Sequence, residues 1–449
     1  MTVTQAAPAV KPAPARRLRQ AQVRHVYLVE RRKLTSQLAV RLVALIAALS
    51  PFVFGAILKV QSGSPTDTLY GVWVHSSGFA MSLLLLAFAG AWGFPLAAGI
   101  IAGDVFSAED RYGTWKWVLT RSCSRGEVFA GKLLAVGVLL TGLVALTGAA
   151  SIVAGVLLIG GDPLVSLSGT VLSSGGSLVR VLASWLQCIL PTLAFASLGV
   201  LFSIATRNGI MGVIGPPLTA LAMQLLLLVG AGIWAHMLLV GSAFGAWHGL
   251  FPATPFFGPL IVGQIVSLVW IVVCLRVAWR IFSRRDFAGA PVARRQGWGP
   301  PARVAVALAA AVALLALAGN WGPVGVTSAK LEPSFLGAFN NLTILQQREV
   351  GRRIPAGARL SILFPTCSRR GSTPTGPGEW VCSFDVASQA SGPMPPQQTT
   401  VTYELSVQGD GCYKAQSPPA FIGQQTMRDD HGASVVNPLY TIYGCFNPL

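Results

Sequence analysis

One stretch decides the fold: residues 79–102 read FAMSLLLLAFAGAWGFPLAAGIIA and contain no charged side chain. An α-helix needs about 20 apolar residues to cross the hydrocarbon of a bilayer. Similar runs recur along the chain, in which 53% of the residues are hydrophobic and only 11% are charged. This composition is too apolar for a soluble globular protein. The sequence therefore predicts a polytopic α-helical membrane protein.

Seven runs are candidates for membrane spans. Six lie at residues 42–58, 79–102, 133–160, 181–205, 210–240 and 259–275, and a seventh, short and rich in alanine, lies at 304–320. The fifth contains Pro216-Pro217 near its start, so we expect it to be kinked there or to begin after this pair. The predicted domains are a basic N-terminus at 1–37, a six-span core at 38–285, a linker at 286–303, the seventh span and an outer domain at 321–449.

The distribution of Lys and Arg predicts the orientation. These residues gather in positions 1–41, in the loop after the second span and in positions 276–303, whereas the opposite short connections contain only Lys59 and Arg180. Cytoplasmic loops are rich in Lys and Arg. We therefore expect a multi-pass protein of the inner (cytoplasmic) cell membrane, with a cytosolic N-terminus and, after seven spans, an extracytoplasmic C-terminus.

Cysteines in the C-terminal region support this topology. Cys367, Cys382, Cys412 and Cys445 lie close together in the sequence, and disulfides persist outside the reducing cytosol. Four cysteines allow three pairings, and the shortest loops favour Cys367 with Cys382 and Cys412 with Cys445. Alternating patterns predict strands at 359–365, 379–386, 399–407 and 439–445. A helix at 333–353 could stand on the membrane as a stalk.

The loop after the second span differs from a plain connector. Residues 103–121 read GDVFSAEDRYGTWKWVLTR and interleave apolar side chains with charges of both signs. Such a mixture is typical of a short interfacial helix, and it also suits a surface that binds a protein partner. From the residues alone, a solvated connector and a docking surface both remain open.

Particular residues of this loop carry a resemblance to a known family. Glu109, Gly113-Thr114, Leu119-Thr120-Arg121, Ser124-Arg125-Gly126 and Gly131-Lys132 together resemble the signature of ABC-2 type transporter permeases. The resemblance implies a coupling helix at 104–119 that contacts a separate ATP-binding subunit. The implied docking residues are Asp104, Phe106, Glu109, Arg111, Gly113, Thr114, Trp115 and Leu119. Residues 29–34 resemble the family's amphipathic helix before span one. We expect Arg121, Arg125 and Lys132 to anchor the loop at the anionic inner leaflet.

Several other functions are disfavoured by the sequence. Residues 126–132 fit GxxxxGK, but Leu133 replaces the Ser or Thr that would bind magnesium, and no strand precedes the motif. No Asp or Glu lies within a predicted span, which disfavours a proton- or sodium-coupled carrier. His236 and His248 have no Cys or carboxylate nearby in sequence, so no metal site is predicted. The basic residues lie between apolar runs, so we expect no nucleic-acid partner.

Together with the resemblance to ABC-2 type permeases, these observations predict a transport subunit that is not itself an enzyme and holds no cofactor. It would be the permease of an ATP-driven ABC exporter, moving a hydrophobic or amphipathic drug, lipid or peptide by alternating access. Its partners would be a second permease copy, the lipid bilayer and a dimer of ATPase subunits that hold ATP and magnesium. The alternative is a membrane-anchored receptor or sensor whose disulfide-bonded outer domain binds a ligand.

Overall fold

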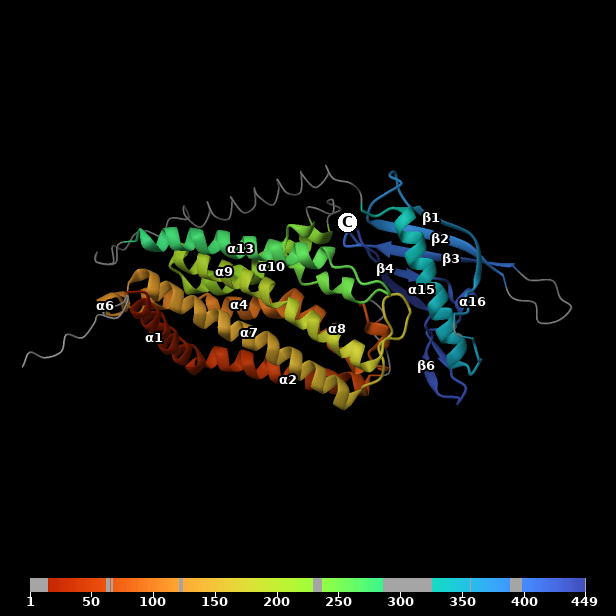
Figure 1. The fold of residues 1–449 in the computed structure, drawn as a ribbon, viewed down its shortest axis with the longest axis horizontal. Coiled ribbons are helices and arrows are strands. Elements are labelled where there is room, and N and C mark those ends of the chain that lie inside the picture. Colours follow the sequence, from red (N-terminus) through yellow and green to blue (C-terminus); the bar gives the residue numbers. More distant parts are fainter. Residues whose placement is uncertain are drawn as a thin grey trace, which may run out of the picture.

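The computed structural model describes residues 15–61, 65, 68–120, 124–228, 236–285, 325–355, 357–387 and 398–448. A helical bundle forms one half of the molecule and a β-sheet domain forms the other (Figure 1). The predicted linker at 286–303 and the predicted seventh span at 304–320 lie outside the described residues.

Among the described residues, six helical segments of the bundle are long and apolar enough to cross a membrane, as a six-span core requires. They are Leu38–Val60, Gly78–Arg111, Arg125–Leu158, Ser174–Thr206, Gly209–Leu226 and Gly258–Ser283. The helices that build them are α2 (Leu38–Val60), α3 (Gly78–Phe88), α4 (Phe94–Ala102), α7 (Arg125–Leu158), α8 (Ser174–Gln187), α9 (Ile189–Thr206), α10 (Gly209–Leu228) and α13 (Gly258–Ser283). An N-terminal helix, α1 (Ala15–Ser36), precedes them.

Two of the predicted spans are interrupted. A π-helical turn at Ala89–Gly93 joins α3 to α4, and α8 gives way to α9 at Cys188. The fifth predicted span extends too far at its end, because Leu239 has an extended backbone before the short helix α12 (Val240–Ala243). Residues 229–235, between α10 and this point, lie outside the described residues. Pro216 and Pro217 lie inside α10, which begins at Gly209, so the helix does not start after them.

Small residues allow close helix packing inside the bundle. A Cβ on Gly103, after α4, would lie 2.3 Å from the backbone carbon of Gly212 in α10. A Cβ on Gly212 would lie 2.1 Å from the carbonyl oxygen of Gly103. Both glycines are therefore required for this approach, as is usual where membrane helices pack through small residues. This contact fixes the end of the second apolar segment from which the loop after it extends.

The outer domain contains a five-stranded antiparallel sheet in the order β1-β2-β3-β4-β7. The strands are β1 (Ser361–Arg369), β2 (Gly378–Ala387), β3 (Gln398–Val407), β4 (Cys412–Gln416) and β7 (Thr441–Cys445), and β5 (Thr426–Arg428) pairs with β6 (Ser434–Val436). The four predicted strands match β1, β2, β3 and β7. The strands β4, β5 and β6 were not predicted, because they are short and lie among turn residues.

Helix α15 (Ser328–Glu349) packs across the sheet, so the prediction of a stalk is wrong. Phe335 and Phe339 are buried on one face of α15, with ring centroids 5.3 Å and 5.9 Å from that of Tyr403 on β3. Both favoured disulfides, Cys367–Cys382 and Cys412–Cys445, are present. Each joins residues directly opposite one another on paired strands.

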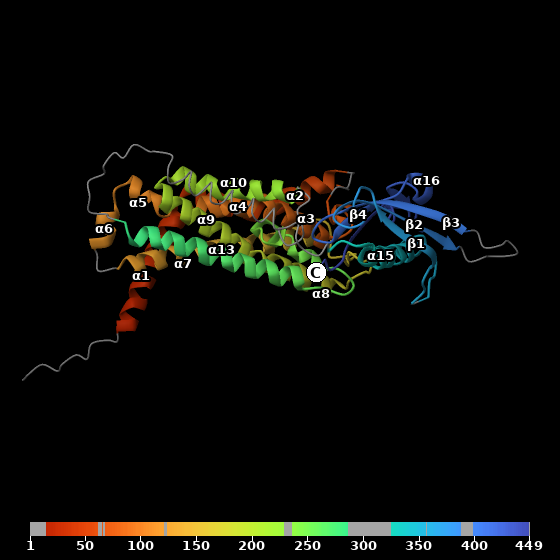
Figure 2. The same cartoon turned by 90° about the horizontal axis from the view of Figure 1, so that it is seen from above.

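The outer domain rests on the loops at one end of the bundle. Asn341 of α15 donates a hydrogen bond of 2.7 Å to the carbonyl of Ser168 in the loop after α7. Cys412 and Cys445 join the same buried cluster as residues of the bundle. Helices α5 (Ser107–Arg111) and α6 (Trp115–Thr120) lie at the opposite end of the bundle, as Figure 2 shows.

Candidate functional site

The loop between the second and third spans folds into two short helices. The predicted single helix at 104–119 is wrong in this respect, because α5 ends at Arg111 and α6 begins at Trp115. Gly113 between them has φ +64°, a left-handed conformation that favours glycine. The amide of Thr114 donates to the carbonyl of Glu109 at 3.0 Å and closes the turn. The break turns α6 away from α5 and creates a compact, folded loop.

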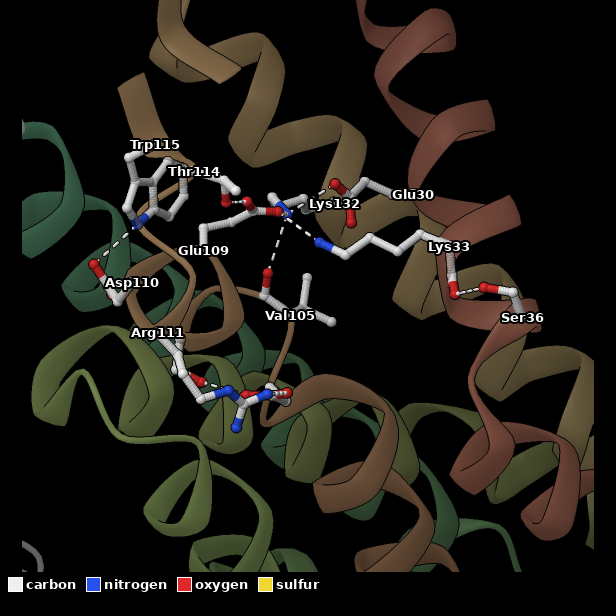
Figure 3. Close-up of polar contacts among 12 residues, drawn as sticks. Glu30, Lys33, Ser36, Val105, Glu109, Asp110, Arg111, Thr114, Trp115 and Lys132 are labelled. Carbon is white, nitrogen blue, oxygen red and sulfur yellow. Dashed lines mark hydrogen bonds and ion pairs between the residues drawn. The ribbon is translucent and has the colours of Figure 1, made fainter. Parts of the chain in front are cut away.

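Lys132 lies at the centre of the interactions that hold this loop. Its side chain is completely buried, and Nζ donates to Glu30 Oε1 at 2.8 Å, to the carbonyl oxygen of Val105 at 3.0 Å and to Glu109 Oε1 at 3.1 Å (Figure 3). These partners come from α1 and from the first part of the loop, before and within α5, whereas Lys132 belongs to α7. One ammonium group therefore connects three segments. Removing one partner of such a buried pair is strongly destabilising.

A second cation completes the cluster. Lys33 of α1 donates to Glu109 Oε1 at 2.6 Å, and the hydroxyl of Thr114 donates to the other oxygen of Glu109 (Figure 3). Partial burial favours the neutral amine of Lys33, but the carboxylates of Glu30 and Glu109 raise its pKa above the ordinary value. Glu109 is thus held by two ammonium groups and a hydroxyl. We call Glu30, Lys33, Glu109, Thr114 and Lys132 the ion-pair cluster.

An aromatic cluster lies beside the ion-pair cluster. Phe106, before α5, and Trp115, in α6, contact Phe282 near the end of α13, with ring centroids 5.5 Å and 5.3 Å away respectively. Phe129 of α7 joins them, 5.5 Å from Phe106. All four side chains are buried. This cluster ties the loop to the last span of the core as well as to the third.

Two further ion pairs brace the loop. Arg285, directly after α13, donates to Asp110 Oδ2 at 2.8 Å, and the indole N–H of Trp115 donates to Asp110 Oδ1 at 2.9 Å. Arg111 donates to Asp104 at 2.7 Å across α5. Asp110 therefore links both short helices to α13.

The structure brings most of the predicted docking residues together, but in a supporting role. Phe106, Glu109 and Trp115 are buried inside the loop and so are not available to a partner. Exposed aromatic side chains lie elsewhere, on Tyr112 (71% exposed) and Trp117 (74% exposed). These two residues were not among the predicted sites. Leu119 is partly buried and packs against the core of the bundle.

The predicted membrane anchors also need correction. Lys132 cannot contact lipid headgroups, because its ammonium is buried among carboxylates. Arg125 donates to the carbonyl of Ser283 at 2.6 Å and joins the start of α7 to the end of α13. Arg121 lies outside the described residues.

Sequence reasoning missed Glu30, Lys33, Asp110 and Arg285 as site residues. One indication was available: Glu30 is the first acidic residue of the chain and lies among many basic ones. Nothing in the sequence, however, indicates which of the distant lysines it contacts.

A cavity of about 620 Å³ lies at the opposite end, between the bundle and the outer domain. Its lining includes Trp247, His248, Gln408 and Asp410. His248 Nδ1 lies 3.4 Å from Asp410 Oδ2 and 3.5 Å from Cys412 Sγ, so folding supplies the carboxylate and the sulfur that its sequence neighbourhood lacks. Cys412 is bonded to Cys445 and offers no thiolate to a metal ion.

Burial and hydrogen bonding act on Asp410 in opposite directions. Partial burial favours its neutral form, but hydrogen bonds from His248 and from the amide of Cys412 hold its pKa below the ordinary value. Asp410 therefore contributes a negative charge to the cavity wall at neutral pH.

A family model described as a protein of unknown function (DUF2705) matches residues 45–288. No curated protein matches the sequence. The matched region begins inside α2 and ends shortly after α13, so it contains most of the helical bundle together with α5 and α6, and it leaves out the outer domain. It covers more than half of the 449 residues. The chain therefore belongs to this family of proteins of unknown function, DUF2705.

Proposed function

We propose that this chain is the membrane-spanning permease subunit of an ATP-driven exporter of the ABC-2 type. It would move a hydrophobic or amphipathic substrate across the cell membrane and would work with a second permease copy and a pair of separate ATPase subunits. The observation that carries the proposal is the loop of α5 and α6, which presents Tyr112 and Trp117 outward while its inner side is held by the ion-pair cluster.

The exposed side of the loop has the composition of a protein-binding surface. Tyr112, Trp117 and Lys116 are exposed, and Tyr and Trp are the residues that most often dominate the binding energy of protein interfaces. Arg111 stacks over the ring of Tyr112, with its guanidinium carbon 5.0 Å from the ring centroid. A partner that covers both rings would bury apolar surface beside several charges.

The buried side of the loop is suited to transmit force. Glu109 is bound to Lys33 of α1 and Lys132 of α7, and the aromatic cluster contacts α13. A displacement of α6 by an ATPase subunit would therefore move α1, α7 and α13 together. Alternating access requires such coupling, because the energy of the transport cycle is released in a different subunit.

Three features of the fold agree with this proposal. The bundle supplies six apolar helical segments among the described residues. The loop lies at the end of the bundle opposite to the disulfide-bonded outer domain (Figure 1). Disulfides are typical of the extracytoplasmic side of a membrane. The loop would then face the cytosol, where ATP is available.

Co-purification tests the proposal. We expect the tagged full chain, extracted from its native membrane, to retain a separate ATP-hydrolysing subunit, and Trp117→Ala to reduce the retained ATPase activity at least about tenfold, as for a central interface residue. Phe364→Ala is the matched control, because Phe364 is a similarly exposed aromatic residue (77%) in the outer domain. The absence of any ATPase from the wild-type preparation would refute the proposal.

A second candidate is a membrane-anchored receptor or sensor. The observation in its favour is the cavity of about 620 Å³, whose wall includes Trp247 and His248 of the bundle and Asp410 of the outer domain. A receptor would retain no ATPase but would bind a ligand through the outer domain. Co-purification therefore separates the two candidates.

A further inference from the structure

A groove of about 920 Å³ lies on the bundle near the ion-pair cluster but outside it. Its walls come from α1, from the start of α7 and from the end of α13. The residues that characterise it are Val23, Arg24, Tyr27, Arg125, Leu134 and Trp279. None of them belongs to the ion-pair cluster, so the proposed coupling does not explain the groove.

The chemistry of the groove changes along its length. Arg125, the first residue of α7, provides positive charge at one end, and Arg24 of α1 also lines the groove. Leu134 follows Arg125 by nine residues on α7, about 14 Å along the helix axis, and its side chain is 47% exposed. The groove thus joins a cationic end to an apolar end over a distance comparable with part of a lipid molecule.

Aromatic side chains lie between these two ends. Tyr27 and Trp279 both line the groove, and the ring of Trp279 is fixed 5.2 Å from that of Phe129. Tyr and Trp are enriched where membrane proteins meet the headgroup region. The order of arginine, aromatic and aliphatic side chains therefore matches the order of headgroup, interface and acyl chain in a phospholipid.

The groove also has one acidic residue, Glu127, so its two arginines and one carboxylate leave a formal charge of +1. Glu127 accepts a hydrogen bond of 2.7 Å from the amide of Ser124 in the capping box of α7, and its side chain is buried. Arg24 lies on the exposed face of α1. A guanidinium group carries five N–H donors in a fixed plane, so Arg125 can bind a phosphate while it also donates to the carbonyl of Ser283 at 2.6 Å.

We propose that this groove binds one anionic phospholipid, with its phosphate between Arg24 and Arg125 and an acyl chain along Leu134. The lipid would join α1 to α7 and α13 from the outside, while the ion-pair cluster joins α1 to α7 from the inside. This site is independent of the exporter proposal, since it requires only that the six spans lie in a membrane.

Native mass spectrometry of the full chain in detergent tests this site. The probes are dioleoylphosphatidylglycerol, dioleoylphosphatidylcholine and inorganic phosphate. We expect the wild-type chain to retain phosphatidylglycerol in preference to phosphatidylcholine. Arg24→Gln should weaken this retention about fivefold, because one cationic side chain near an anionic lipid contributes a factor of that size. Arg32→Gln is the matched control, since Arg32 is exposed on the same helix and does not line the groove.

Three results would overturn the proposal. The first is equal retention of the two lipids by the wild-type chain. The second is an equal loss of phosphatidylglycerol retention in Arg24→Gln and Arg32→Gln, which would indicate that the lipid is attracted to the positive charge of α1 as a whole. The third is displacement of phosphatidylglycerol by millimolar inorganic phosphate, which would indicate a site for free phosphate. Each of these results leaves the co-purification of an ATPase unaffected.

Discussion

Replacing Lys132 with methionine tests the ion-pair cluster. The substitution keeps a similar side-chain volume but removes hydrogen bonds to Glu30 Oε1, Glu109 Oε1 and the carbonyl of Val105. Glu109 keeps Lys33 at 2.6 Å, whereas Glu30 is left buried, and its Oε2 already has no partner within the described residues. Stranding one buried charge costs about 3–5 kcal/mol. Because Lys33 still pairs with Glu109, we expect the stability of the loop to fall by about 3 kcal/mol, the lower end of this range.

Hydrogen–deuterium exchange of the loop measures this loss locally. The amides of Ala108, Tyr112 and Thr114 donate to carbonyls inside the loop, so their exchange reports its opening. A loss of about 3 kcal/mol corresponds to about a hundredfold faster exchange. Adding Glu30→Gln removes the stranded charge and should restore about half of the loss.

The matched control is Lys59→Met, since Lys59 is exposed at the far end of α2. We expect no change of exchange in the loop for this variant. Unchanged exchange in Lys132→Met, or equal exchange with and without Glu30→Gln, would refute the role assigned to the cluster.

Three further predictions concern the turn, a disulfide and the outer cavity. Gly113→Ala should destabilise the protein by about 1–2 kcal/mol, because Gly113 has a φ of +64°. Gly337→Ala, at an exposed position of α15, should stabilise it by about 0.5–1 kcal/mol. Thermal unfolding that gives both variants a stability change of the same sign would contradict this reasoning. Replacing both Cys412 and Cys445 with serine should lower the free energy of unfolding of the outer domain by about 3–4 kcal/mol. Pulse proteolysis in increasing urea measures this loss, and an unchanged urea midpoint of unfolding would disprove it. The lowered pKa of Asp410 stabilises the fold above about pH 4, and this contribution disappears as the pH falls through the native pKa. Between about pH 4 and pH 2, the Tm of Asp410→Asn should therefore decrease less than the Tm of the wild type. Equal decreases in Tm would count against this role of Asp410.

The spans could be predicted from the sequence because bilayer thickness imposes a length on apolar runs. The predicted run at 42–58 corresponds to α2 at Leu38–Val60. The π-helical turn at Ala89–Gly93 and the extended backbone at Leu239 could not be predicted in this way, since hydropathy does not depend on the hydrogen-bonding pattern of the backbone. The pairing of the disulfides follows from the strand register, which the short loops approximate.

The ion-pair cluster could be predicted only in part. Glu109 and Thr114 belong to a recognisable local pattern, but Lys132 contacts Glu30 across 102 positions of the chain. Such a contact depends on how α1 packs against α7, and no local periodicity contains that information. The same limit explains why Lys132 was expected at the lipid surface rather than in the protein interior.

The helix α15 could have been predicted more accurately. Leu331, Phe335, Phe339 and Leu342 repeat at the spacing of one helix face, which is typical of packing against a second layer. The buried positions of all four confirm that reading.

Photo-crosslinking from position 117 tests the central claim most directly. p-Benzoylphenylalanine is introduced as Trp117→p-benzoylphenylalanine, the native membrane is irradiated, and the attached protein is identified by mass spectrometry. Our account predicts a crosslink to a separate subunit that has a complete phosphate-binding loop. The same substitution at Phe364, in the outer domain, should give no such product. If position 117 labels only lipid, or a protein without a nucleotide-binding site, the proposal that α5 and α6 couple this chain to an ATPase is wrong.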